Sequence, residues 1–155
     1  MGCTWSPLQG WATVAIAAFV AFITLNQWRV ARAKVKLDLF EERYGVFLVL
    51  WTYLTHAPLG DEMTPEMRAD QSRFRNATPK AFFLFGTEIG EYFEEVNAKG
   101  VALAQAMRRL HKMPPDAPGR KGAEAAANEL HQWFSDALLG LRGRFAAHMD
   151  LGAWR

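Results

Sequence analysis

The chain has 155 residues, of which 50% are hydrophobic, and a formal net charge of +2. This charge is too small to indicate nucleic-acid binding, and one cysteine excludes both an intrachain disulfide and a zinc cluster built from cysteines. Beyond a membrane span, the length leaves room for one modest helical domain.

An apolar segment near the start of the sequence predicts a membrane span. Only three residues of the segment 8–25 are polar and none is charged. As a helix it rises roughly 27 Å, close to the roughly 30 Å hydrocarbon core of a bilayer. We therefore expect a transmembrane helix over residues 8–28, preceded by a short external tail over residues 1–7.

Aromatic and basic residues flank the predicted span. Trp5 and Trp11 stand at one end and Trp28 at the other, and indole rings favour the headgroup level of a bilayer. The first charged residues of the chain follow the span and are all basic: Arg29, Arg32, Lys34 and Lys36. By the positive-inside rule this flank is cytoplasmic, so the N-terminus is expected outside a bacterial inner membrane and the C-terminal domain in the cytoplasm.

Two other interpretations of the N-terminus compete with a span. A cleaved signal peptide needs basic residues before its apolar stretch, whereas here they follow it. Met1-Gly2-Cys3 fits the start of a myristoylation signal, with Cys3 available for a second acyl chain. A spanning helix already anchors the chain, so a lipid adds little and the span is favoured.

The predicted span continues as a helix without a break. Apolar residues alternate at intervals of three and four in the heptad pattern at Val30, Ala33, Leu37, Phe40, Tyr44, Phe47, Trp51 and Leu54. We expect a basic juxtamembrane stalk over residues 29–45 and a cytosolic bundle over residues 46–155. Because the segment 46–54 is apolar nearly all round, it is expected to be a core helix covered on several sides, ended by Pro58 and Gly60.

Caps and breakers divide the remaining chain into helices. Thr64-Pro65 predicts a helix start, with the helix ending near Asn76, and Thr78-Pro79 predicts a second start, with a helix reaching about Met113. Gly86-Thr87 is an alternative break in that helix, with Thr87 as its N-cap.

The loop 114–119 is rich in proline, and a last helix is expected from about Ala123 to His148. Its expected buried face comprises Leu130, Trp133, Phe134, Ala137, Leu141 and Phe145. No β-strand is expected, and the short loops favour antiparallel neighbours. The predicted fold is all-α, with an N-terminal transmembrane helix continuing into a cytosolic antiparallel helical bundle.

Small residues in the span indicate self-association. Thr13, Ala17 and Ala21 are four apart on one helix face, where helices approach closely in lipid. Leu37 and Phe40 extend an apolar seam into the stalk, where water would otherwise surround it. The sequence therefore predicts a homo-oligomer in a lipid bilayer.

A cluster of carboxylates is the first candidate for chemistry. Glu88, Glu91 and Glu95 share a helix face, but a di-metal site in a bundle also needs Glu-x-x-His, which the chain lacks. A solvated acidic face is expected instead, able to dock the basic group Arg108, Arg109 and Lys112 of another chain.

The dense aromatics indicate core packing rather than a cofactor pocket, since they keep helical spacing. They are Phe82, Phe83, Phe85, Tyr92, Phe93, Trp133 and Phe134, expected to pack against Phe40, Tyr44, Phe47 and Trp51. No cofactor, metal or catalytic residue is predicted.

The segments Lys36–Tyr44 (KLDLFEERY) and Phe83–Tyr92 (FLFGTEIGEY), behind an N-terminal apolar segment, resemble a recurrent type of small single-pass bacterial membrane protein with no assigned function. The resemblance implies a bacterial inner-membrane setting and carries over no activity or functional residue.

The expected function is a non-enzymatic, membrane-tethered helical module that presents a cytosolic surface to a membrane or cytosolic protein, most simply a second copy of itself. Two alternatives stay open. One is a membrane-bound effector or regulator whose bundle senses a signal and perturbs the bilayer or a partner, and the other is an enzyme with an unfamiliar site.

Overall fold

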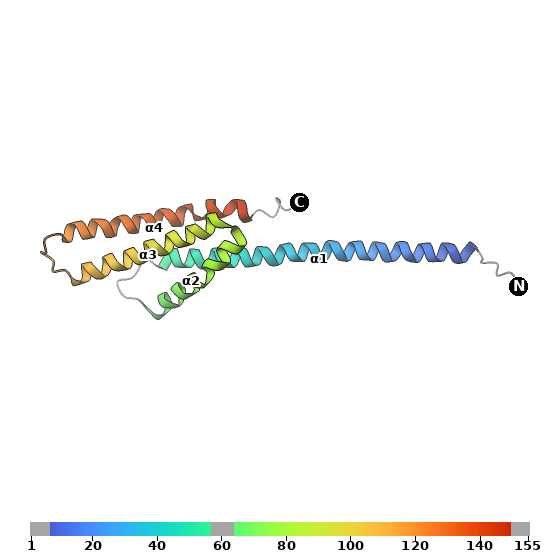
Figure 1. Cartoon of the computed structure of the whole chain (residues 1–155), viewed down its shortest axis with the longest axis horizontal. Coiled ribbons are helices and arrows are strands. Elements are labelled where there is room, and N and C mark those ends of the chain that lie inside the picture. The colour runs from blue at the N-terminus through green and yellow to red at the C-terminus, as the bar shows by residue number, and fades with distance from the viewer. Residues whose placement is uncertain (1–6, 57–63, 150–155) are drawn as a thin grey trace. The chain divides into compact units, whose positions relative to one another are not determined.

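A computed structural model describes residues 7–56 and 64–149, without the side chains of residues 7–10 and 12. These residues form four helices and no strand: α1 (Pro7–His56), α2 (Pro65–Phe85), α3 (Thr87–Lys112) and α4 (Arg120–Met149) (Figure 1). The fold is all-α, as the sequence predicts. The chain divides into two units, Met1–Phe40 and Glu41–Arg155.

α1 is one uninterrupted helix of 50 residues, which confirms the predicted continuation of the apolar segment. No proline or glycine pair interrupts it, and His56 in its last turn suits the negative end of the helix dipole. The predicted stop signals Pro58 and Gly60 lie outside the described residues.

α2 begins where the sequence predicts a helix start. The Thr64 hydroxyl accepts a hydrogen bond from the backbone N–H of Met67 at 3.2 Å, and Pro65 takes the first helical turn. The N-cap prediction at Thr64 is therefore confirmed.

The predicted end near Asn76 and new start at Thr78-Pro79 are wrong, because Pro79 lies inside α2. An internal proline costs about 3 kcal/mol. Residues on both sides of it are buried on one face at intervals of three or four: Phe74, Ala77, Ala81 and Phe85. Each buried phenylalanine stabilises by roughly 1.5–3 kcal/mol, so a continuous buried face outweighs the proline.

The alternative break at Gly86-Thr87 is confirmed, but the cap falls one residue earlier than predicted. Gly86 has φ +83° and ψ −168° and stands between α2 and α3, while Thr87 is the first residue of α3. Side chains other than hydrogen rarely tolerate this φ, which explains a glycine here. The Gly86 N–H donates to the Phe82 carbonyl and closes α2.

α3 and α4 run antiparallel. The Tyr92 hydroxyl lies 3.5 Å from the Ala137 carbonyl oxygen, and the Lys99 ammonium lies 5.5 Å from the ring centre of Trp133. The residue numbers rise along α3 as they fall along α4, which is the predicted arrangement. The loop 113–119 joins them, and α4 begins three residues before the predicted start.

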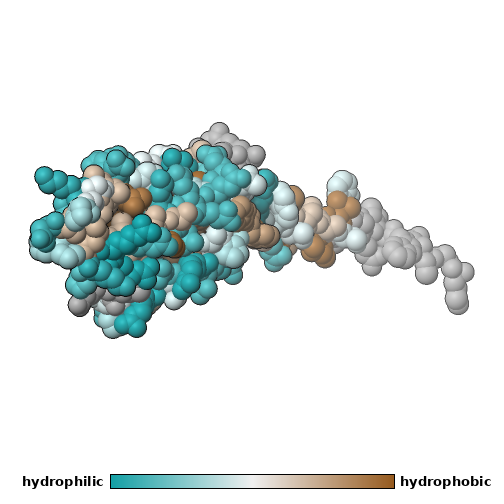
Figure 2. Space-filling view, turned by 60° about the vertical axis from the view of Figure 1, so that its left-hand side comes forward, coloured by the Kyte–Doolittle hydropathy of each residue, from teal (hydrophilic) through white to brown (hydrophobic). Residues whose placement is uncertain are grey.

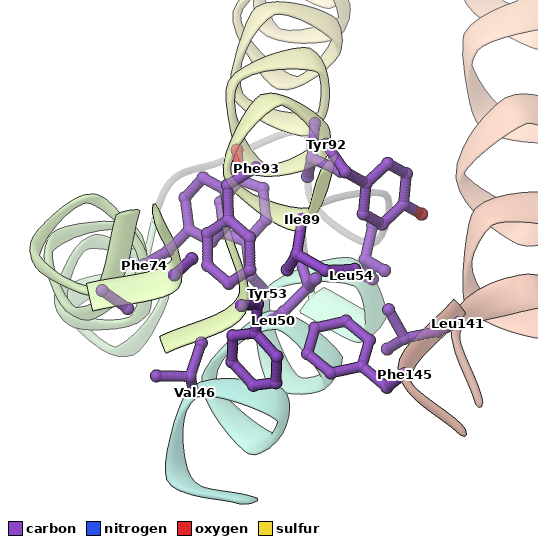
Figure 3. Close-up of a cluster of buried hydrophobic side chains, with 14 of the residues drawn as sticks. Val46, Leu50, Tyr53, Leu54, Phe74, Ile89, Tyr92, Phe93, Leu141 and Phe145 are labelled. Atoms are coloured by element: carbon purple, nitrogen blue, oxygen red, sulfur yellow. The ribbon is translucent and has the colours of Figure 1, made fainter. Parts of the chain in front are cut away.

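Stacked rings join α1, α2 and α3 in the core of the second unit. The Tyr53 and Phe74 ring centres are 4.2 Å apart, and those of Phe74 and Phe93 are 5.2 Å apart. Figure 3 shows these side chains converging with Leu50, Leu54 and others from the four helices. Such stacked pairs stabilise beyond the area they bury.

Edge-on rings bring α4 into the same core. Phe145 lies edge-on to Phe47 at 5.3 Å and to Phe85 at 5.0 Å between ring centres. Of the predicted buried face of α4, three residues are buried and three pack against the core while partly exposed; the buried three are Phe134, Leu141 and Phe145.

The expected aromatic packing is confirmed for most rings and wrong for Phe83, which is 88% exposed. Residues 81 and 85 are buried, and at 100° per residue position 83 falls on the opposite face of α2. The expectation that the segment 46–54 is covered on several sides also fails for Leu48 and Trp51, which are exposed.

Candidate membrane span and interaction surface

The N-terminal half of α1 is an apolar helix with no cover in this chain. Every described side chain from Trp11 to Leu25 is exposed. Among the described residues, α1 is the one helix that is long and apolar enough to cross a membrane, by length and composition, and none of its most apolar stretch is buried. Figure 2 shows hydrophobic side chains along this helix, whereas the visible face of the second unit is mostly hydrophilic.

Most of the residues predicted to lie at the membrane interface are exposed as well. Trp11 and Trp28 are exposed, and Trp5 lies outside the described residues. The basic flank is exposed at Arg29, Arg32 and Lys34 and partly buried at Lys36. The Arg32 guanidinium lies 5.4 Å from the Trp28 ring centre, so an aromatic ring and a cation share one turn of the flank.

The predicted self-association residues divide into two groups. Thr13, Ala17 and Ala21 are exposed and lie on one side of α1 at intervals of four. Leu37 is exposed, while Phe40 is partly buried. Pairing of two copies along these residues stays a prediction.

A buried carboxylate that the sequence does not predict joins the end of α1 to α2. Asp70 accepts a hydrogen bond from His56 Nδ1 at 2.7 Å and one from the Arg73 guanidinium at 3.2 Å. The Asp70 side chain is 9% exposed and that of His56 is 45% exposed. The only sequence signal is that Asp70 precedes Phe74 by four residues and so lies on the same buried face of α2.

A second unpredicted contact places Arg43 of α1 against the end of α4. Its guanidinium donates to the His148 carbonyl oxygen at 2.8 Å and lies 5.5 Å from the Phe85 ring centre. Burial lowers the pKa of Arg43 from its ordinary value. An arginine at this place satisfies a carbonyl of the last turn of α4, where cations are favoured.

The predicted acidic and basic faces are both on the surface. Glu88, Glu91 and Glu95 are exposed on α3, as are Arg108, Arg109 and Lys112 near its end. Within residues 7–56 and 64–149, no group of three or more His, Cys, Asp or Glu side chains is placed to hold a metal ion. The three carboxylates lie in solvent, and Glu88 lies in the first turn of α3, beside the positive end of the helix dipole.

Known proteins give no further guidance, since no protein-family model, no curated protein and no solved structure matches the chain. The exposed apolar half of α1 is thus the feature of the described residues that points most directly to a function.

Proposed function

We propose that this protein is a membrane-anchored helical interaction module. The observation that carries the proposal is the full exposure of the described side chains from Trp11 to Leu25 on the same helix that supplies Leu50 and Leu54 to the core. An uncovered apolar surface of this length is unfavourable in water and matches the thickness of a bilayer. One helix therefore serves as both anchor and structural support.

In the proposed orientation, the N-terminus lies outside a bacterial inner membrane and the second unit lies in the cytoplasm. Arg29, Arg32 and Lys34 are exposed directly after the apolar stretch, where cations near anionic headgroups each contribute on the order of 1 kcal/mol. The resemblance of Lys36–Tyr44 to small bacterial membrane proteins supports the same setting.

Two copies associate along α1 in this proposal. Leu37 and Phe40 form the contact outside the membrane. Thr13, Ala17 and Ala21 allow close approach in lipid, but at 100° per residue they lie on the opposite side of α1 from Leu37 and therefore form a separate contact. Covering one large apolar side chain stabilises by roughly 1.5–3 kcal/mol, which matters for two chains confined to one membrane.

Disulfide crosslinking in native membranes tests the association. In a Cys3→Ser background, Leu37→Cys and Phe40→Cys are expected to crosslink between chains, while the exposed neighbour Asp38→Cys is the matched control. Absence of crosslinks at both positions, together with a single copy per complex in photobleaching, would exclude self-association.

Protease accessibility tests the anchor and its orientation. In intact spheroplasts the C-terminal domain is expected to resist an added protease and to be cleaved after lysis. Cleavage in intact spheroplasts would contradict the orientation, and recovery of the chain in the soluble fraction would contradict the anchor.

A further inference from the structure

The charged residues that follow the apolar half of α1 are not spread evenly around the helix. At 100° per residue, Arg29, Arg32 and Lys36 fall within about 60° of one another, whereas Lys34 lies on the other side. Asp38, the first acidic residue of the chain, shares the side of Lys34, four positions further on. Within residues 29–38, one side of α1 therefore carries only basic residues, here called the basic stripe, and the other side carries both signs of charge.

The position of the Arg32 side chain indicates the direction in which the stripe extends. Its guanidinium lies 5.4 Å from the ring centre of Trp28, one turn closer to the N-terminus. Long side chains on a helix point back toward the N-terminus in this way, and in α1 that direction leads to the apolar half. Lys36 lies roughly 12 Å beyond Trp28 along the axis and on the side of Arg32, so its charge acts within about one Debye length of the level of Trp28.

The arginines of the stripe have hydrogen-bond donors available for a ligand. Within residues 7–56 and 64–149, neither Arg29 nor Arg32 forms an ion pair with a carboxylate. Both side chains are exposed, as is Trp28. An arginine beside an indole can still present two parallel N–H groups to a phosphate. Because an indole favours the headgroup level of a bilayer, these donors lie where lipid phosphates are found.

We infer that the basic stripe, together with Trp28, binds the phosphate groups of anionic phospholipids in the leaflet at this end of the apolar segment. The inference rests on the proposed membrane anchor and specifies its lipid partner. It goes beyond the positive-inside rule, which counts the four cations of the flank alike and concerns only orientation. The stripe gives one side of α1 a preference among lipids.

An anionic lipid fits the stripe better than a zwitterionic lipid or a dissolved phosphate does. In phosphatidylcholine a quaternary ammonium balances the phosphate, whereas phosphatidylglycerol carries an uncompensated negative charge to which clustered cations are attracted. The exposed apolar side chains that precede Trp28 place acyl chains beside the helix. Lipid headgroups therefore reach the stripe at a high effective concentration, which a dissolved phosphate does not have.

Spin-labelled lipids test the inference with the full chain reconstituted in phosphatidylcholine vesicles. Traces of spin-labelled phosphatidylglycerol or phosphatidylcholine report, by electron spin resonance, which lipid the protein surface holds. The wild-type chain is expected to prefer phosphatidylglycerol about threefold or more, and Arg32→Gln and Lys36→Gln are each expected to remove about half of that preference.

Lys34→Gln is the matched control, because it removes the same charge from the same type of side chain on the other side of the helix. Lys34 is also closer to the apolar segment than Lys36 is. A flank that acts only through its total charge therefore predicts an effect of Lys34→Gln at least as large as that of Lys36→Gln. The basic stripe predicts an effect at most about a third as large.

The remaining outcomes distinguish the lipid preference from the membrane anchor. If the chain inserts but holds both labelled lipids equally, or if Lys34→Gln and Lys36→Gln have equal effects, the inference is wrong and the proposed function stands. If the chain stays in solution after detergent removal and restricts no labelled lipid, both are wrong. A preference that is lost in inorganic phosphate, but not in sodium chloride of the same ionic strength, would show that the stripe takes dissolved phosphate, which also overturns the inference.

Discussion

At Gly90 the packing leaves no room for a side chain. A Cβ at this position would overlap the ring of Phe82, whereas a Cβ at Gly45 would meet no atom within 4 Å. We expect Gly90→Ala to lower the free energy of unfolding by about 1–3 kcal/mol, because the partly buried Phe82 ring has to move aside. Gly45→Ala, the control, is expected to raise it by about 0.5–1 kcal/mol through helix propensity.

Urea unfolding of the detergent-solubilised protein, followed by circular dichroism, measures both changes. Equal effects of Gly90→Ala and Gly45→Ala would show that propensity alone governs these two positions and that the Phe82 contact has no energetic weight.

Because two tyrosines are buried, we expect the folded state to lose stability at high pH. Burial raises the pKa of Tyr53 above its ordinary value of 10.0, against the opposing charge of Arg75, and it raises the pKa of Tyr92 above 10.0, against that of Arg144. The folded state therefore holds the phenolic protons more tightly than the unfolded state. Their contribution is complete below pH 10 and is lost as the pH rises through the folded pKa.

The double variant Tyr53→Phe, Tyr92→Phe is expected to reduce the fall in melting temperature between pH 9 and pH 11, roughly the range around the unfolded tyrosine pKa. Tyr44→Phe is the control, because Tyr44 is exposed and is the remaining tyrosine of the chain. The same fall in the double variant and in the control would contradict the assignment.

At the scale of the element, two similar local signals have different outcomes. Thr64-Pro65 starts α2, whereas Thr78-Pro79 lies within it. The difference is tertiary, because Ala77 and Ala81 are buried on a face that runs past the proline. A local cap pattern contains no information about that face, so the sequence alone could not choose between the two outcomes.

Pro79 is accordingly expected to weaken α2. Pro79→Ala restores a backbone N–H and removes the clash of the ring with the preceding turn, and it is expected to raise the free energy of unfolding by about 1–3 kcal/mol. Chemical unfolding measures this, with Pro118→Ala in the α3–α4 loop as the control. A loss of stability in Pro79→Ala would mean that the proline fixes a bend that the core requires.

At the scale of the whole molecule, the sequence could predict the helices and the exposed apolar segment, because composition and period determine both. It could not predict which side of the segment 46–54 faces the bundle, since that segment is apolar nearly all round and offers no polar face to mark the outside. The exposure of Leu48 and Trp51 is thus known only from the fold. The same holds for the contact between His56 and the buried Asp70, which are 14 positions apart.

The residues of the hydrophobic core lie in the second unit, whereas the residues proposed for self-association lie in the first. The fragment 36–155 contains every residue of the hydrophobic core, so it is expected to fold alone, with helical circular dichroism and a cooperative melt. Without the apolar segment no bilayer concentrates the fragment, so it is expected to be monomeric at micromolar concentration, whereas the full chain is proposed to associate in a bilayer. Analytical ultracentrifugation of the fragment measures this directly. A fragment that dimerises in solution would show that association needs no membrane, whereas a fragment that fails to fold would show that the apolar half of α1 is needed for folding of the core.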